Sequence, residues 1–480
     1  MFKKNDELVM DITGFGSEGE GIGKPEGFPL FVKKAIPGEK ILAGVTKVKK
    51  TYGYARIIEI IEKSPDRTGE KCPYAKRCGG CSLQHLDYQA QLKFKTEKVK
   101  NNLLRLGGID IDVPDCIGMD DPWRYRNKAQ VPLGKDKDGN IMAGFYAEAS
   151  HTVIPHDDCL IGCIENGPIV KYVTEFMKEY GISAYDEEKH TGLVRHILIR
   201  KGYHTGEIMV CLIINGNDLP AKEELVRRLL AFEGMTSISL NINKEKGNVI
   251  LGEKIENLYG PGYITDMIGP LSFRINPLAF FQVNPIQTEK LYKKALEFVD
   301  LKGNETVWDI YCGIGTISLF LAQKAGSVRG IEIIPEAVEN AKENALLNGF
   351  TNTDFYTGTA EELLPRIYEK EQKGADVIVV DPPRKGCGQS LLETIVKMQP
   401  SRVVYVSCDS ATLSRDLKWF AEHGYATVKV QPVDMFPHTA HVEVVSLLQR
   451  MSNPSKRAIT LDVEMEDYHR IKRGSGEVYL

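Results

Sequence analysis

The strongest constraint on the fold is an alternation of strand-like and helix-like segments that begins at about residue 304. The strand-like segments, such as VWDIYC, ADVIVVDPP and RVVYVSC, are continuous apolar runs. Segments with helical character separate them, as in PEAVENAKENALLNG. Continuous apolar strands are typical of a parallel sheet that helices cover on both faces. The second half of the chain is therefore predicted to be a doubly wound, Rossmann-like α/β domain.

The first turn of this domain has the pattern of a cofactor-binding loop. In DIYCGIGTISL, Gly313 and Gly315 allow the backbone to approach a ligand at the N-terminus of a helix. Glu332 ends the next strand, where a carboxylate can accept hydrogen bonds from ribose hydroxyls. The third glycine of the dinucleotide pattern is missing, so the cofactor need not contain a pyrophosphate. Together with Asp309 and the DPPR motif at 381–384, the pattern indicates S-adenosylmethionine; a βαβ turn without a ligand is the alternative.

Two further residues point to a reaction. Cys408 ends the apolar strand RVVYVSC, at the sheet edge where ligands bind in open α/β folds. A lone cysteine at such a position is often a small buried apolar residue, but the polar stretch DSATLSR follows it directly. Glu443 opens a later apolar strand and is either a solvated strand end or a positioned base.

Five motifs in order then carry a resemblance. They are FFQVNPIQTEKLY (280–292), DIYCGIGTISL, DPPRKG, VYVSCDSATLSRDL and HTAHVEVVSLL. Over about residues 270–448 the chain resembles the RNA uracil-5-methyltransferase family, and its front resembles the ribosomal RNA branch, which carries a TRAM domain and an iron–sulfur cluster. The resemblance implies that Cys408 is the nucleophile and Glu443 the proton acceptor, with His438 or His441 as the next candidates for the base. It also implies four cofactor-binding residues: Gln282, Tyr311, Glu332 and Asp381. Gln282 and Asp381 are candidates for contact with the uracil as well.

The chemistry of the family explains these residue types. Carbon 5 of uracil is too weak a nucleophile to take a methyl group from a sulfonium, and addition of a thiolate at carbon 6 makes it nucleophilic. A base must then remove the carbon-5 proton. Related chemistries lack their signatures here: cytosine-5 enzymes carry a Pro-Cys pair in place of Asp-Pro-Pro-Arg, and amino-group methyltransferases have an aromatic residue at the position of Arg384.

A cluster of cysteines lies far upstream. Cys72, Cys78 and Cys81 have the spacing C-x5-C-x2-C, which differs from the two close pairs of most structural zinc sites and from radical S-adenosylmethionine enzymes. A four-thiolate site needs one more cysteine, and Cys159 or Cys163 can supply it. The resemblance implies Cys159 as the fourth ligand and a 4Fe–4S cluster as the metal group. The spacing alone leaves zinc open.

The front of the chain has features of an RNA-binding module. Residues 1–63 read as short strands separated by glycine turns, the pattern of a small β-barrel, and resemble a TRAM domain. Residues 1–110 contain 20 Lys and Arg against 14 Asp and Glu, although the whole chain has a net charge of −4. The stretch WRYRNKAQ (123–130) is a second candidate RNA surface, with a solvated basic strand as the alternative. The barrel residues that could contact RNA are Lys33, Lys34, Lys47, Lys49, Lys50, Tyr52, Tyr54 and Arg56.

These observations predict four parts of the chain. They are a TRAM domain (1–63), a central α+β domain with the iron–sulfur loop (64–269), a methyltransferase domain (270–450) and a tail of unknown role (451–480). An amphipathic helix near 88–108 is expected to pack on the methyltransferase domain.

The predicted function is transfer of a methyl group from S-adenosylmethionine to carbon 5 of a uridine in 23S, large-subunit ribosomal RNA. The alternatives are the same reaction on transfer RNA and a scaffold that binds RNA without catalysis. No apolar run is long enough for a membrane span, and the N-terminal segment has no apolar core typical of a secretory leader. We therefore expect a cytoplasmic monomer whose partner is RNA rather than DNA or a membrane.

Overall fold

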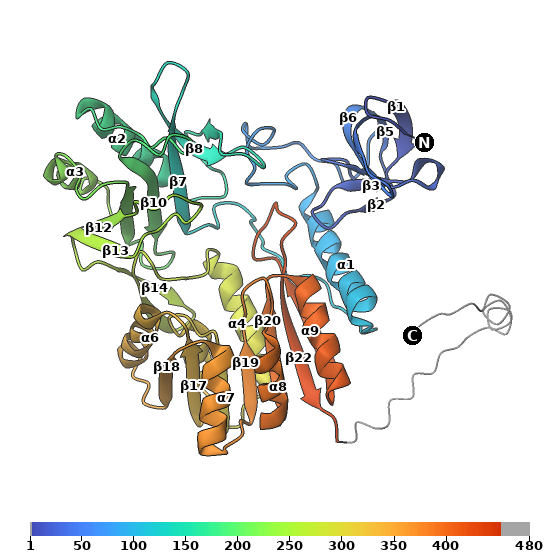
Figure 1. The fold of residues 1–480 in the computed structure, drawn as a ribbon, viewed down its shortest axis with the longest axis vertical. Coiled ribbons are helices and arrows are strands. Elements are labelled where there is room, and N and C mark those ends of the chain that lie inside the picture. The colour runs from blue at the N-terminus through green and yellow to red at the C-terminus, as the bar shows by residue number, and fades with distance from the viewer. Residues whose placement is uncertain (1, 453–480) are drawn as a thin grey trace.

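The computed structural model describes residues 2–452, so all but the first two residues of the predicted tail (451–480) lie outside the described part. Three sheets of six, seven and seven strands organise the chain, and a two-stranded hairpin joins the last two. Figure 1 shows the first sheet as a separate small unit, the second beside it, and the third with its helices below both. None of the helices in residues 2–452 has the length and apolarity that a membrane span requires.

The front of the chain forms a small barrel-like sheet in the order β1-β5-β6-β4-β3-β2. Its strands close around apolar side chains that include Leu30, Val32 and Ile41, all fully buried. The sequence predicted four strand-like segments here; two further short strands complete the sheet because glycine turns allow the chain to reverse within a few residues. The strands are β1 Glu7–Asp11, β2 Gly14–Phe15, β3 Gly21–Gly23, β4 Leu30–Val32, β5 Lys40–Val48 and β6 Gly53–Glu62.

The middle of the chain forms a second sheet, in the order β13-β12-β11-β10-β7-β8-β9. Helices α2 and α3 cover one face, where Phe176 and Leu225 are buried, and the other face joins the core of the third sheet through Leu198 and Met209. The elements are β7 Lys128–Lys135, β8 Ile141–Tyr146, β9 Val153–Pro155, α2 Asn166–Glu179, β10 Val194–Lys201, β11 Ile208–Ile214, α3 Lys222–Leu229, β12 Met235–Ile242 and β13 Lys254–Tyr259.

The last part of the chain is a doubly wound sheet in the order β18-β17-β16-β19-β20-β22-β21. All its strands are parallel except β22, which runs antiparallel between β20 and β21. Side chains of β19 alternate between two separate cores, Val377 and Val379 in one and Ile378 and Val380 in the other, because helices cover both faces. This confirms the predicted Rossmann-like α/β domain.

The elements of this last part follow the predicted alternation closely. A hairpin, β14 and β15, precedes helix α4. Each strand from β16 to β20 is then followed by a helix, and β21 leads directly to β22, the last described strand. The elements are β14 Ile264–Ile268, β15 Leu271–Ile275, α4 Pro285–Val299, β16 Thr306–Ile310, α5 Thr316–Ala322, β17 Ser327–Glu332, α6 Pro335–Leu347, β18 Thr353–Thr357, α7 Ala360–Glu371, β19 Val377–Val380, α8 Gln389–Met398, β20 Arg402–Ser407, α9 Ser410–Glu422, β21 Tyr425–Val433 and β22 Glu443–Arg450.

Helix α1 (Tyr88–Gly107) lies between the front of the chain and the last sheet, beside α9 (Figure 1). Asp87 caps its first turn by accepting a hydrogen bond from the Gln89 N–H, and Gly108 ends it in the left-handed conformation. Asn102 on α1 donates a hydrogen bond of 2.8 Å to the Ser410 hydroxyl at the start of α9. The helix is therefore a packing partner of the last α/β domain, although it ends at Gly107 and the first strand of that part, β14, begins at Ile264.

Candidate functional site

All six predicted catalytic and cofactor residues line one cavity. It lies at the carboxyl edge of the third sheet and has a volume of about 680 Å³. Parallel strands place the residues that follow them at this common edge, which is where open α/β sheets bind ligands. The volume is in the range of sites that enclose a small molecule. The six residues are Gln282, Tyr311, Glu332, Asp381, Cys408 and Glu443.

The antiparallel strand β22 explains why Cys408 and Glu443 meet. Cys408 follows the last residue of β20, and Glu443 is the first residue of β22. The two strands pair with Ser407 opposite Val444, so the next position in the register sets Cys408 against Glu443. A strand that runs against its neighbours begins where they end. The fold therefore places a thiol and a carboxylate, distant in sequence, side by side in the cavity.

Burial controls the ionisation of this pair. Burial, together with the nearby Glu443 and Asp381 carboxylates, raises the pKa of the Cys408 thiol to about 11. Burial also raises the pKa of Glu443 to about 8, with a contribution from Asp381. Arg384 opposes both shifts. Cys408 also precedes the first turn of α9, whose capping residue Asp409 accepts bonds from two backbone N–H groups, so that helix terminus favours a thiolate.

The cavity collects acidic side chains that a cation would stabilise. Burial raises the pKa of Asp309 to about 7, and burial together with Asp309 does the same for Asp381. One oxygen of Asp309 has no hydrogen-bond partner among the described residues. Buried carboxylates that raise one another's pKa are relieved when a positive charge enters. A ligand with a cationic centre, such as a sulfonium, therefore fits this cavity.

The glycine turn after β16 is held in shape by Glu332. Its carboxylate accepts hydrogen bonds from the N–H groups of Gly313, at 3.1 Å, and Ile334, at 3.0 Å. Gly313 and Gly315 have positive φ angles of 54° and 83°, which favour glycine. Tyr311 also has a positive φ, 68°, and its hydroxyl donates to Glu361 at 2.8 Å. Such backbone strain at a non-glycine residue is common at ligand sites.

The cavity contains residues that the sequence analysis did not assign to the site. Phe280 is 67% exposed and lines the cavity, as do Arg384 and Phe436. Phe280 and Arg384 lie inside the motifs quoted above, and their closeness in sequence to Gln282 and Asp381 was a signal that they belong to the site. The sequence gives no such signal for Phe436, because only the folded chain brings its segment to the cavity.

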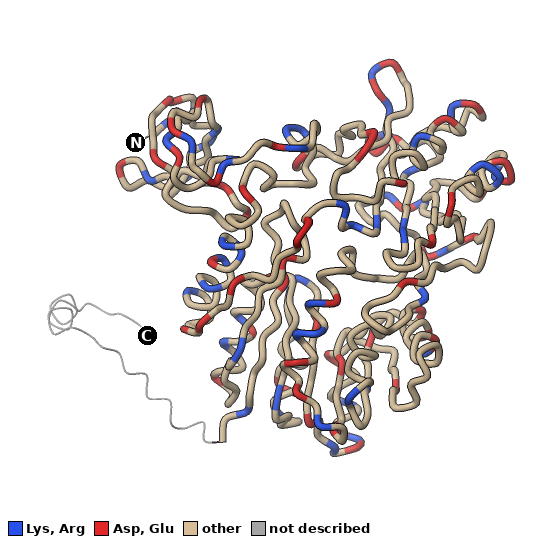
Figure 2. The backbone as a smooth tube through the Cα atoms, turned by 180° about the vertical axis from the view of Figure 1, so that it is seen from behind, with Lys and Arg blue, Asp and Glu red and all other residues tan. Residues whose placement is uncertain are grey.

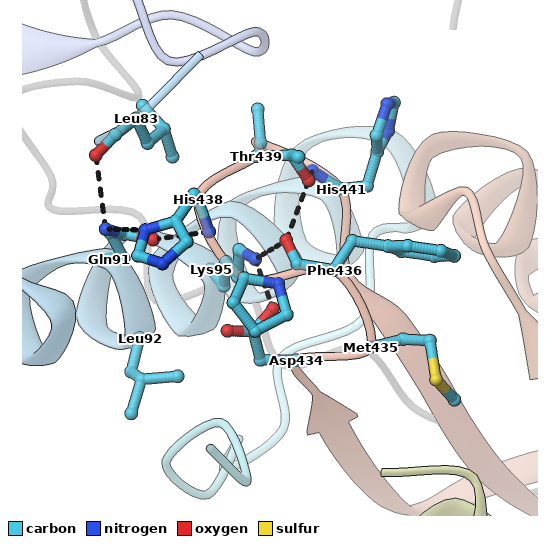
Figure 3. Close-up of polar contacts among 12 residues, drawn as sticks. Leu83, Gln91, Leu92, Lys95, Asp434, Met435, Phe436, His438, Thr439 and His441 are labelled. Carbon is cyan, nitrogen blue, oxygen red and sulfur yellow. Dashed lines mark hydrogen bonds and ion pairs between the residues drawn. The ribbon is translucent and has the colours of Figure 1, made fainter. Parts of the chain in front are cut away.

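The segment 434–442, which carries Phe436 into the cavity, is held by helix α1. The ammonium group of Lys95 forms an ion pair with Asp434 and donates a hydrogen bond of 3.0 Å to the Phe436 carbonyl (Figure 3). Both side chains of the pair are fully buried. Lys98 on the same helix donates to the Ala440 carbonyl at 3.0 Å. Two lysines of α1 therefore fix the backbone that leads to the catalytic edge.

The same segment is tied to the cysteine loop. The Gln91 amide accepts from the His438 N–H at 2.9 Å and donates to the Leu83 carbonyl at 3.1 Å (Figure 3). The Leu83 N–H in turn donates to the His438 carbonyl at 2.9 Å. Leu83 lies two residues after Cys81, and His438 lies five residues before Glu443. The cysteine loop is therefore joined directly to segment 434–442 by the hydrogen bond between Leu83 and His438.

The two histidines of this segment differ in position. His441 lines the cavity, whereas His438 does not. The His438 ring stacks on Trp123 with ring centroids 4.0 Å apart, and burial lowers its pKa to about 4. His441 is thus the one of the two that can reach a ligand in the cavity.

Replacing Lys95 with Met should lower the free energy of unfolding by about 3–5 kcal/mol, because it leaves the buried Asp434 carboxylate without its partner. Urea denaturation followed by fluorescence measures the loss. Lys93→Met, on an exposed position of α1, is the control and should change stability by less than about 0.5 kcal/mol. Equal effects of the two variants would contradict a structural role for the pair.

The four predicted cluster ligands line a second cavity, of about 190 Å³. Cys72, Cys78, Cys81 and Cys159 contribute thiols to it, and no carboxylate does. Cys163 does not line the cavity; its thiol donates to the Arg126 carbonyl at 3.3 Å. Within residues 2–452 no three His, Cys, Asp or Glu side chains come close enough to hold a single metal ion. The thiols are thus gathered around a space rather than around one point.

The WRYRNKAQ stretch, predicted as a candidate RNA surface, lies partly beside the cysteines. Tyr125 and Asn127 are buried, whereas Arg126 and Lys128 are half-buried and line the cysteine cavity. The alternation of the strand thus directs these cations to one side, as expected, and contact of that side with RNA stays a prediction. His156, which the sequence left as a turn residue or a second layer around the metal, also lines this cavity.

The barrel presents a group of aromatic side chains with cations around it. Phe31, Tyr52 and Tyr54 lie with ring centroids 5.6–6.0 Å apart. Two of the lysines predicted to contact RNA are paired with acids instead: Lys33 with Glu148 and Lys34 with Glu70. Figure 2 shows Lys and Arg distributed over the barrel and along α1, among acidic residues. The aromatic group is typical of surfaces on which bases stack.

Two protein families match parts of the chain. The family described as tRNA (Uracil-5-)-methyltransferase matches residues 269–451, and the TRAM domain matches residues 3–58. The first range contains the whole catalytic cavity, and the second contains the barrel.

Similar proteins cover nearly all of the chain. Uncharacterized RNA methyltransferases of Halalkalibacterium halodurans and Clostridium tetani are 52% and 50% identical to it, over 93% and 95% of this chain and 97% and 98% of theirs. The structure is also similar to Pyrococcus abyssi tRNA (uracil-54, C5)-methyltransferase, solved with S-adenosyl-L-homocysteine. That likeness has a TM-score of 0.75 and 28% identity, and covers 92% of this chain and 99% of the other. The predicted fold, an α/β methyltransferase domain after a TRAM barrel, is confirmed.

Proposed function

The chain belongs to the RNA uracil-5-methyltransferase family and is an RNA methyltransferase with a TRAM domain; we propose that it methylates carbon 5 of a uridine in large-subunit ribosomal RNA, with S-adenosylmethionine as the methyl donor. The observation that carries the proposal is the pairing of Cys408 with Glu443 across β20 and β22, inside the cavity that also contains the glycine turn. A thiol and a carboxylate beside a cofactor site are the two groups that this reaction requires.

The first step is an addition by Cys408. Its thiolate forms a bond from Sγ to carbon 6 of the uracil, and the electron pair of the carbon 5–carbon 6 double bond moves into an enolate. Because burial raises the pKa of this thiol to about 11, the thiolate forms only in small amounts before the substrate binds. Arg384 and the start of α9 both favour the thiolate, and the target base must leave its stack to reach it.

Bound S-adenosylmethionine supplies the methyl group, which carbon 5 takes as the sulfonium carbon–sulfur bond breaks. Glu443 then accepts the proton of carbon 5. The electron pair left behind restores the carbon 5–carbon 6 double bond and expels the Cys408 thiolate. Glu332, beside the glycine turn, is placed to accept hydrogen bonds from the ribose of the cofactor, and Tyr311, Gln282 and Asp381 complete its surroundings.

The cysteine cavity fits a 4Fe–4S cluster. Four thiols and no carboxylate line it, and these soft ligands are the ones that iron–sulfur clusters use. Zinc is the other metal that four thiolates could hold, and metal analysis distinguishes the two. The cluster would stabilise the loop that bonds to the catalytic segment at His438.

Two cysteine variants test the ligand set. Cys159→Ser should abolish metal binding, because it removes one of the four thiols of the cavity, whereas Cys163→Ser should retain it. Iron and sulfide analysis and the visible absorption of protein purified without oxygen measure this. We expect about four irons per chain in the wild type and in Cys163→Ser. A colourless wild type with one zinc, or loss of metal in Cys163→Ser alone, would refute the assignment.

Transfer RNA is the second candidate substrate. The similarity to the Pyrococcus abyssi tRNA enzyme extends over the front of the chain, so the barrel and cysteine loop do not distinguish the two classes of RNA. The deciding experiment is mass spectrometry of ribosomal and transfer RNA from a strain that lacks the gene. Loss of 5-methyluridine from 23S ribosomal RNA is expected; loss from transfer RNA alone would establish the second candidate instead.

A further inference from the structure

We propose that Lys128 and Arg126, supported by Arg200, provide the positive charge that balances an anionic metal–thiolate group in the cysteine cavity. The inference rests on the proposed cluster and assigns a role to residues outside its four ligands. These cations would then help to set the reduction potential of the cluster and its resistance to loss of iron.

The three cations form a strip on one side of the second sheet. Arg126 and Lys128 alternate with Asn127, so they face the same side, and both line the cavity with the four thiols. Arg200 on β10 stands directly opposite Lys128 on β7. Residues paired in this way share a face of the sheet. The strip therefore leads from the cavity into the protein interior.

None of the three cations has an acidic partner among residues 2–452. No ion pair in this part of the chain includes them, and no Asp or Glu lines the cavity. The Arg200 side chain is almost fully buried, and only one of its nitrogens finds an acceptor, the Ala279 carbonyl at 2.9 Å. Its other two nitrogens, and Nε of Arg126, have no hydrogen-bond partner in the described structure.

Burying these three cations is unfavourable in free energy when no anion lies beside them. Buried charges in proteins are normally paired, because removing them from water costs several kcal/mol each. Here burial, together with the neighbouring Arg200 and Arg126, lowers the pKa of Lys128 to about 8. Three cations that repel one another beside a cavity therefore indicate that the occupant of this cavity is negatively charged.

A cluster held by four thiolates meets this requirement, because the thiolates carry more negative charge than the iron–sulfur core neutralises. An RNA phosphate is the other anion that could satisfy lysine and arginine. The cavity favours the cluster: four cysteines line it together with Arg126 and Lys128, and its remaining walls include Phe145, Leu160 and Ile161.

The experiment compares wild type with Lys128→Met and Lys128→Arg, all purified without oxygen. Removing a nearby positive charge destabilises the more negative reduced cluster, so Lys128→Met should shift the reduction potential to a more negative value. It should also lose iron to a chelator about tenfold faster. Lys128→Arg should restore both properties. The control is Lys135→Met, which removes a lysine from an exposed end of the same strand and should match wild type.

The outcomes separate this inference from the cluster itself. Wild type without iron and sulfide would refute the cluster, and the inference with it. Wild type with a cluster, but with potential and iron loss unchanged in Lys128→Met, would refute only the inference. Unchanged cluster properties with weaker binding of RNA would assign the strip to phosphate contact. Should Lys128→Met fail to fold, Arg126→Gln tests the same charge and must shift the potential in the same direction.

Discussion

Cys408→Ala is expected to reduce RNA methylation by at least about 10⁴-fold while S-adenosylmethionine still binds. In the proposed mechanism the thiol makes carbon 5 nucleophilic, and among the described residues the other cysteine that lines the cavity is the buried Cys312. The residues proposed to hold the cofactor lie on other strands, at Glu332 and the glycine turn, so its affinity should change by no more than a factor of about two. Transfer of radiolabelled methyl groups to RNA and calorimetry with the cofactor measure the two quantities.

The control is Cys116→Ala, which removes a buried thiol from the core outside the cavity and should leave the methylation rate close to wild type. Two results would exclude Cys408 as the nucleophile: turnover by Cys408→Ala near the wild-type rate, or loss of cofactor binding together with activity. The second would show that the thiol supports the cofactor rather than attacks the base.

The sequence indicated which residues line the cavity, because in an open α/β sheet the carboxyl edge is made by residues at strand ends. Glu332, Asp381 and Cys408 each end or follow an apolar strand, and the register of the parallel sheet then brings them together. The meeting of Cys408 with Glu443 could be expected only from the family resemblance. It depends on the insertion of β22 between β20 and β21, and the order of strands is a property of tertiary packing.

Contacts between segments that are distant in the chain could not be predicted from the sequence, because they too depend on tertiary packing. Lys95 and Asp434 are 339 residues apart, and each taken alone is an ordinary charged residue of an amphipathic helix or a loop. Their complete burial arises only when α1 packs beside α9. The WRYRNKAQ stretch is a similar case: its alternation was evident, but the sequence could not show that Arg126 and Lys128 lie beside the cysteines.

The position of the cysteine loop links it to the first cavity. The loop bonds to His438 through Leu83, and His438 leads directly to the segment with His441 and Glu443. If the proposed metal group stabilises this loop, it also supports the side of the cavity that contains Glu443, whereas the glycine turn is held separately by Glu332. Loss of the metal should accordingly weaken handling of RNA before it weakens binding of the cofactor.

Glu443→Gln is expected to stop the reaction after methyl transfer and to trap the enzyme on its RNA. An amide cannot accept the carbon-5 proton, whereas addition of Cys408 and transfer of the methyl group do not require that acceptor. The electron pair needed to expel the thiolate then stays in the carbon–hydrogen bond. The product should be a methylated adduct joined to RNA through Cys408, visible as a slowly migrating band on a denaturing gel with radiolabelled RNA.

This band should require S-adenosylmethionine and should be absent from the Cys408→Ala, Glu443→Gln double variant, which is the matched control. Wild type should show little of it, because elimination is fast once the proton has left. Burial raises the pKa of Glu443 to about 8, while Arg384 opposes this shift and a bound sulfonium would oppose it further, so the carboxylate becomes available as a base when the cofactor is present. Free, fully methylated RNA formed by Glu443→Gln at the wild-type rate would refute this role. His441, the histidine of the segment that lines the cavity, would then be the next residue to test.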